Sequence, residues 1–131
     1  MGKIDQGNSY AIAALLRILE NTENHEGNRA QAAGSLGKID QGNPHAITEL
    51  IRILETTENK NIRWEAADNL QKILATPEQY AGVVSALKDC LSNEVYQNNF
   101  DLFNKCYKVL WECAANLPYP DFYHAWHSPP E

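Results

Sequence analysis

"GKIDQGNPHAITELIRILE", residues 37–55, closely repeats "GKIDQGNSYAIAALLRILE", residues 2–20, at an offset of 35 positions. Over residues 2–24 and 37–59 the two copies agree at 17 of 23 positions. After a one-residue slip, residues 29–39 match residues 63–73 at six of eleven positions. The first half of the chain is therefore built from a repeated unit, which predicts a repeat architecture.

Each unit contains two blocks with helical periodicity. In the first block of the second unit, apolar residues recur at i, i+3, i+4 and i+7, namely Ile47, Leu50, Ile51 and Leu54. In the second block, Ala66, Ala67, Leu70 and Ile73 follow a similar pattern. The segments between blocks are short and polar. One helical hairpin per unit, and an all-α fold, are predicted.

The heptapeptide GKIDQGN is predicted to be the turn that joins two hairpins. A helix ending at Ile39 is followed by Gly42, which can adopt a left-handed turn, and by Asn43, a favourable N-cap. Pro44 suits the first turn of the next helix. The same turn is expected at residues 2–8, where no helix precedes it. We therefore expect the chain to begin in the middle of a repeat.

The strings "RAQAAGSLGKI" (29–39) and "RWEAADNLQKI" (63–73) resemble the second helix of short HEAT repeats of the phycobilisome-lyase type. The resemblance implies a short α-solenoid, in which stacked hairpins share one core and offer a binding surface. It also implies that Arg29 and Arg63 bond to carbonyls or acids of an adjacent hairpin. Exposure of both arginines at the surface is the alternative.

Beyond residue 75 the repeat lapses, but helical patterns continue. Thr76 and Pro77 are typical of a helix start. The polar segment 92–99 is expected to be a loop, and residues 100–117 a long helix whose aromatic and aliphatic residues form one broad stripe. We interpret the whole chain, 1–131, as a single helical domain. Its parts are repeat 1 (2–36), repeat 2 (37–75), a degenerate hairpin that caps the stack (76–117), and a tail rich in proline and aromatic residues (118–131).

The tail carries the second resemblance. "CAANLPYPDFYHAWH", residues 113–127, is similar to a segment that follows the HEAT repeats in bacterial, especially cyanobacterial, NACHT-family NTPases. Within the tail, Asp121 is expected to cap a short helical turn. The phosphate-binding pattern Gly-x-x-x-x-Gly-Lys-Ser/Thr does not occur in the sequence, so nucleotide hydrolysis is not carried over.

Metal or nucleophile chemistry is a competing interpretation of the same region. Cys113, His124 and His127 are potential zinc ligands, and Cys113 with His124 is a formal nucleophile pair. Cys106 is about 10 Å from Cys113 along one helix, too far for a shared tetrahedral metal. No catalytic residue, cofactor or metal site is therefore assigned, and the cysteines are predicted to act as small core residues.

Five aromatic residues are candidates for an interaction site. Tyr119, Phe122, Tyr123 and Trp126 either fold back on the long helix to seal the core or anchor a partner. Trp64 replaces the Ala30 of the first unit, and either packs against the helix that follows residue 76 or belongs to a binding surface.

Composition narrows the partners. The formal charge is −6, and eleven Lys and Arg form no basic face for nucleic acid. No apolar run approaches the ~20 residues that span a bilayer, and no signal peptide is apparent. Three cysteines without a secretory context favour reduced thiols. These features predict a cytoplasmic protein that does not bind membranes.

The preferred function is a non-enzymatic protein–protein interaction module or scaffold, as a fragment or remnant of a NACHT-type signalling or defence NTPase. The alternative is a bilin lyase or isomerase subunit, because the same repeat type builds those enzymes. The first helix lacks a covering neighbour, so a homodimer through this helix is also expected.

Overall fold

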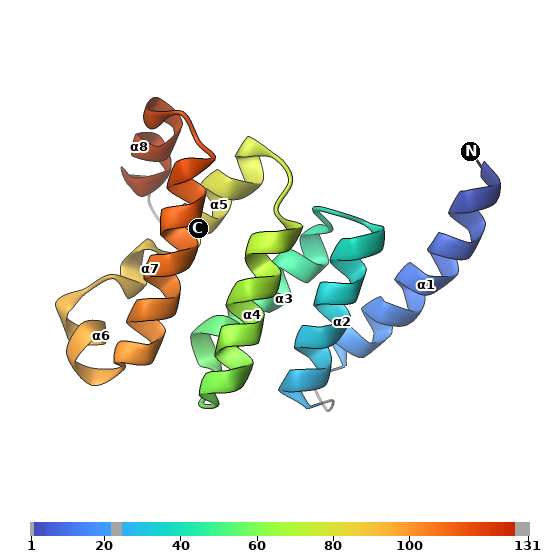
Figure 1. Cartoon of the computed structure of the whole chain (residues 1–131), viewed down its shortest axis with the longest axis horizontal. Coiled ribbons are helices and arrows are strands. Elements are labelled where there is room, and N and C mark those ends of the chain that lie inside the picture. Colours follow the sequence, from blue (N-terminus) through green and yellow to red (C-terminus); the bar gives the residue numbers. More distant parts are fainter. Residues whose placement is uncertain (1, 22–24, 128–131) are drawn as a thin grey trace.

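The structure, a computed structural model, describes residues 2–21 and 25–127, with side chains from residue 9 onward. Every regular element in these ranges is helical. The elements are α1 (Gly2–Glu20), α2 (Glu26–Ile39), α3 (Pro44–Thr56), α4 (Lys60–Ile73), α5 (Pro77–Leu87), the 3-10 turn η1 (Lys88–Cys90), α6 (Asn93–Asn98), α7 (Phe100–Ala115) and α8 (Tyr119–His127). In Figure 1, α2, α4 and α7 lie side by side in front, α3 and α5 lie behind them, and α1 lies to the right of α2. The predicted all-α solenoid is confirmed.

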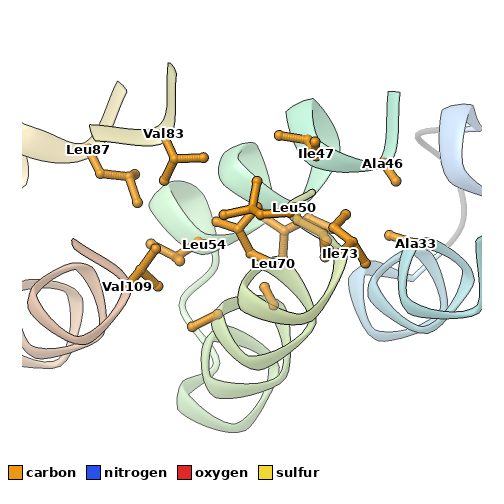
Figure 2. Packing of buried hydrophobic residues seen from close by; sticks show 14 of the residues in the cluster. Ala33, Ala46, Ile47, Leu50, Leu54, Leu70, Ile73, Val83, Leu87 and Val109 are labelled. Atoms are coloured by element: carbon orange, nitrogen blue, oxygen red, sulfur yellow. The ribbon is translucent and has the colours of Figure 1, made fainter. Parts of the chain in front are cut away.

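One apolar core runs between the two layers. Figure 2 shows Leu50 and Leu54 of α3 meeting Leu70 of α4, with Val83 and Val109 joining from α5 and α7. All five side chains are buried. Burial of each is worth roughly 1.5–3 kcal/mol relative to exposure, so the shared core is what binds the hairpins together.

The turn between the first two hairpins forms as predicted. The helix α2 ends at Ile39, and Gly42 adopts a left-handed φ of 81°. The Asn43 side chain accepts hydrogen bonds from the backbone N–H groups of His45 (2.9 Å) and Ala46 (3.1 Å). Pro44 occupies the first helical position of α3.

The N-terminal copy of the same heptapeptide is helical, so the predicted turn at residues 2–8 is wrong. The helix α1 already begins at Gly2. The interior turn is held from outside, because the Gln79 side chain donates a hydrogen bond to the Gly42 carbonyl at 2.7 Å. Counted from the helix caps, Thr76 of α5 and Asn43 of α3, the equivalent of Gln79 is Ala46, which has no side-chain donor. The conformation of the heptapeptide therefore depends on tertiary contacts as well as on its own sequence.

The two repeat arginines are buried, and their predicted role is confirmed. Arg29 donates from Nε to the Leu19 carbonyl at 3.4 Å and from a terminal nitrogen to Glu49 of the next hairpin. Glu49 also accepts from Arg52 at 2.5 and 2.6 Å. Burial lowers the pKa of Arg29, and the neighbouring charge of Arg52 acts in the same direction. Glu49 thus bridges two arginines at this joint.

Arg63 repeats the device one unit later. Its Nε donates to the Leu54 carbonyl at 2.8 Å, the counterpart of Leu19, and a terminal nitrogen donates to the Thr57 carbonyl. The acid comes from a different place, because Arg63 pairs with Asp101 of α7 at 2.8 Å. The repeat motif therefore also fixes the third hairpin to the second.

The third hairpin differs from the prediction in one element. Thr76 caps α5 as expected, but the segment predicted to be a loop contains α6. Ser92 accepts a hydrogen bond from the Val95 N–H at 3.1 Å and starts this short helix. Asn99 ends α6 and caps α7. The caps Ser92 and Asn99 enclose a helix of six residues, which is too short for apolar periodicity to reveal.

Candidate interaction surface

The helix α7 carries two separate stripes, and the single broad stripe expected from the sequence is wrong. Cys106, Val109, Leu110 and Cys113 point into the core. A second stripe is turned roughly 100° away from the first, at the helical 100° per residue. It consists of Phe100, Phe103, Tyr107 and Trp111. Three of these four rings are exposed, so the aromatic stripe is a surface feature of the last hairpin.

Tyr107 and Trp111 are the residues that sequence reasoning missed. They stack on each other at 6.2 Å between ring centroids, with an interplanar angle of 23°. Trp111 nevertheless keeps 67% of its surface exposed. The sequence does contain a sign of this exposure. Tyr107 and Trp111 each follow a core residue, Cys106 and Leu110, by one position, which turns their side chains about 100° away around the helix. Large stacked rings held in water are typical anchors for a protein partner.

A second aromatic group continues the stripe towards α6. Tyr96 contacts Phe100 and Phe103 edge-on, each at 5.1 Å between centroids. Phe100 and Phe103 are themselves stacked at 6.2 Å. Tyr96 and Phe100 remain exposed. The end of the solenoid is thus faced by rings from two helices.

The tail aromatics lie on α8, whose main packing partner is α5. Ser85 Oγ donates to the Ala125 carbonyl at 2.9 Å, and Lys88 Nζ donates to the Trp126 carbonyl at 2.7 Å. These side-chain bonds hold α8 on the outside of α5. The expected cap by Asp121 is wrong, because α8 already begins at Tyr119.

Two of the four aromatic rings in the tail pack against the core, and the other two are exposed. Phe122 and Trp126 are stacked at 5.9 Å and pack partly against the core. Tyr119 and Tyr123 are exposed, the former by 73%. A shallow cleft of about 240 Å³ is lined by these four rings and His127. One pair therefore seals the core while the other faces outward.

Trp64 lies beside α7, so the predicted packing against the helix that begins at Pro77 is wrong. It is 57% exposed. It lines a small hollow of about 50 Å³ with Lys105 and Lys108 of α7. Trp64 therefore belongs to the surface between α4 and α7.

The thiols behave as core groups. Burial raises the pKa of Cys113 to about 12. Hydrogen bonding between the Cys90 and Cys106 thiols lowers the pKa of Cys90 and raises that of Cys106, which is also buried. Among the residues that the structure describes, no three His, Cys, Asp or Glu side chains form a group that could hold a metal ion. Cys113, His124 and His127 are not brought together as ligands.

A cleft also lies between α5 and α8. Its volume is about 410 Å³, and its lining includes Ser85, Asp121 and His124. The Ser85 hydroxyl donates to a backbone carbonyl that ties α8 down. This hydrogen bond of Ser85 holds α8 to α5. The exposed aromatic rings are the stronger candidate for a binding site.

Comparison with known protein families identifies both parts of the chain. The HEAT-repeat model matches residues 12–98, from within α1 to the end of α6. The chain belongs to the HEAT-repeat family. A second model, described as "NACHT C-terminal Cysteine and Histidine-containing", matches residues 99–127, which form α7 and α8. The resemblances to HEAT repeats and to a C-terminal segment of NACHT proteins are thereby confirmed. Searches of curated proteins and of solved structures gave no significant match.

Exposed aromatic residues become frequent close to the point where the two matched regions meet. The HEAT-repeat part contributes the stacked hairpins, whereas the NACHT-associated segment contains most of the exposed rings. Six of the eight exposed aromatic residues among the described side chains lie between residues 96 and 123. No described helix has the length and apolar character that crossing a membrane requires. We call these six exposed residues the aromatic end of the stack, namely Tyr96, Phe100, Tyr107, Trp111, Tyr119 and Tyr123. The HEAT-repeat hairpins support this surface.

Proposed function

We propose that this HEAT-repeat chain is a non-enzymatic protein-binding module whose main contact surface is its aromatic end. The exposed, stacked pair Tyr107 and Trp111 is the observation that carries the proposal. Rings held rigidly by a helix lose little conformational freedom on binding and bury large apolar areas. Interface cores are enriched in tyrosine, tryptophan and phenylalanine, which are the residues gathered here.

The match over residues 99–127 supports a more specific role. We assign the module to NACHT-type signalling or defence proteins, in which the HEAT repeats with their C-terminal segment would contact a protein target. The sequence contains no phosphate-binding loop, so this chain contributes binding and no nucleotide hydrolysis.

Site-specific photo-crosslinking tests this function. A photoreactive phenylalanine analogue replaces Trp111 in one variant and exposed Thr48 of α3 in a control variant, each in cells of the source organism. We expect a protein crosslinked from position 111 and absent from position 48; after purification it should bind the unmodified chain. Crosslinking only from position 48, or a purified protein that does not bind, would contradict the proposal. A visible absorption change with a linear tetrapyrrole would favour the lyase class instead.

The open side of α1 supports a second contact, between two copies of the chain. A groove of about 410 Å³ runs between α1 and α2, and its apolar lining consists of Leu15, Ile18 and Ala32. Ile18 is 39% exposed. Light scattering should give a dimer mass for the unmodified protein and a monomer mass for Ile18→Glu. A monomer at all concentrations for the unmodified protein would contradict this contact.

A further inference from the structure

The surface between α4 and α7 has the form of a continuous groove. One hollow, about 400 Å³, is lined by Gln71, Tyr107, Lys108, Trp111 and Glu112. The smaller hollow around Trp64 shares Gln71 and Lys108 with it. The two helices lie side by side in Figure 1. The groove therefore leads from Trp64 to Trp111, across Gln71 and Lys108.

The length of the groove suits two turns of a helix. Trp64 and Gln71 are seven residues apart on α4, as are Lys105 and Glu112 on α7. Seven residues of helix rise about 10 Å. The groove walls are side chains of two α-helices, whose backbone groups are bonded within each helix. An extended peptide would find no backbone ladder here, whereas a helix satisfies its own backbone.

Some of the charged side chains along the groove are already paired within the chain, and others are not. Lys105 is paired with Asp101 at 3.0 Å, and Asp68 with Lys72 at 2.9 Å. Among the described side chains, neither Lys108, at the shared centre, nor Glu112, beside Trp111, takes part in an ion pair, and of the two only Lys108 lines both hollows. A carboxylate in the middle of an incoming segment would complement this ammonium group.

The two ends also differ in size. The hollow beside Trp111 has room for a bulky apolar side chain, whereas the hollow beside Trp64 admits only a small one. This asymmetry would fix the register of a bound helix.

We propose that the groove between Trp64 and Trp111 binds an amphipathic helix of a partner protein. The helix carries a large apolar residue for the Trp111 end and an acidic residue three or four positions away that pairs with Lys108. A small residue faces Trp64. This inference rests on the proposed function and names the kind of partner that the aromatic surface accepts.

A display library of short monomeric helices, randomised on one face, provides the probe. Selection on the purified full chain should enrich sequences with Leu, Phe or Trp at one position and Asp or Glu three or four positions away. Fluorescence anisotropy of the selected peptides then compares Lys108→Glu with the control Lys38→Glu, an exposed lysine of α2. We expect at least a ten-fold loss of affinity for the first and less than a two-fold change for the second. Replacing the peptide acid by lysine should restore binding to Lys108→Glu.

Three results would overturn the inference: no enrichment of acidic residues, equal effects of the two lysine variants, or selected peptides that bind without forming a helix, as measured by circular dichroism. These results leave the crosslinking experiment unaffected. If a partner is crosslinked at position 111 but the charge swap does not restore binding, the proposed function stands and the proposal of a helical partner is wrong.

Discussion

Arg63 of α4 and Asp101 of α7 form a buried ion pair, with 2.8 Å between Nη1 and Oδ2, and this pair joins the second hairpin to the third. Lys105 donates to the other carboxylate oxygen of Asp101 at 3.0 Å. Arg63 lies in the matched HEAT-repeat region and Asp101 in the NACHT-associated segment, so the pair links the two. The aromatic end surface is thus anchored to the repeat stack by a residue of the repeat motif itself.

Removing the Asp101 carboxylate should destabilise the fold strongly. The Asp101→Ala variant leaves the Arg63 guanidinium buried without its acid, which typically costs about 3 kcal/mol. Asp121→Ala, at an exposed acid of α8, is the control and should change the free energy of unfolding by less than about 0.5 kcal/mol. Urea unfolding at neutral pH measures both. Equal midpoints would show that the pair does not hold the third hairpin.

The pH dependence of stability provides a separate test of this pair. Burial alone raises the pKa of Asp101, but hydrogen bonds from Arg63 and Lys105 outweigh it, and the net shift is downward. The stabilisation is therefore complete above the unfolded-state pKa of about 3.9 and lost as the pH falls through the lower folded-state value. The stability difference between wild type and Asp101→Asn should be constant near neutrality and shrink below about pH 4. A difference that persists undiminished in acid would contradict the assignment.

Two glycines give opposite predictions for the same substitution. A Cβ at Gly37 would overlap Cγ2 of the buried Ile73, where α2 and α4 approach closely. Gly37→Ala should therefore cost about 1–3 kcal/mol. Gly82, inside α5, has open space where a Cβ would lie, with nothing within 4 Å, so Gly82→Ala should stabilise by about 0.5–1 kcal/mol. Thermal unfolding compares them, and midpoints that move in the same direction would refute this packing.

Thiol alkylation should distinguish the cysteines. Cys90 is only partly buried and has a lowered pKa, whereas burial raises the pKa of Cys113 to about 12. Iodoacetamide at neutral pH should therefore modify Cys90 first, and Cys106 and Cys113 only after denaturation. Peptide mass spectrometry follows each site over time. Modification of native Cys113 at the rate of Cys90 would place Cys113 at the surface.

The fold could be predicted well where local chemistry and periodicity agree. Gly42, Asn43 and Pro44 encode a turn and a cap in consecutive positions, and the arginine of each repeat bonds an equivalent carbonyl, that of Leu19 or of Leu54. The prediction for the N-terminal heptapeptide is wrong because its conformation depends on a contact equivalent to that of Gln79, which lies far away in sequence. Such contacts are invisible to local patterns.

The candidate site is only partly predictable for a similar reason. Trp64, Tyr119 and Tyr123 are possible anchors by sequence, and all three are exposed. Tyr107 and Trp111 escape this prediction because they follow apolar spacing as well as Leu110 does. An aromatic stripe that faces a partner and an aliphatic stripe that faces the core have the same period, so only their relative angle separates them.

The affinity of a purified, crosslink-identified partner for two variants tests the central claim most directly. Trp111→Ala removes a ring from the aromatic end, and Tyr10→Ala removes an equally exposed ring from α1 at the opposite end. Calorimetry should show a loss of about 2 kcal/mol, or roughly thirty-fold in Kd, for Trp111→Ala and almost none for Tyr10→Ala. Equal affinities of the two variants would contradict the assignment of the aromatic end as the binding surface.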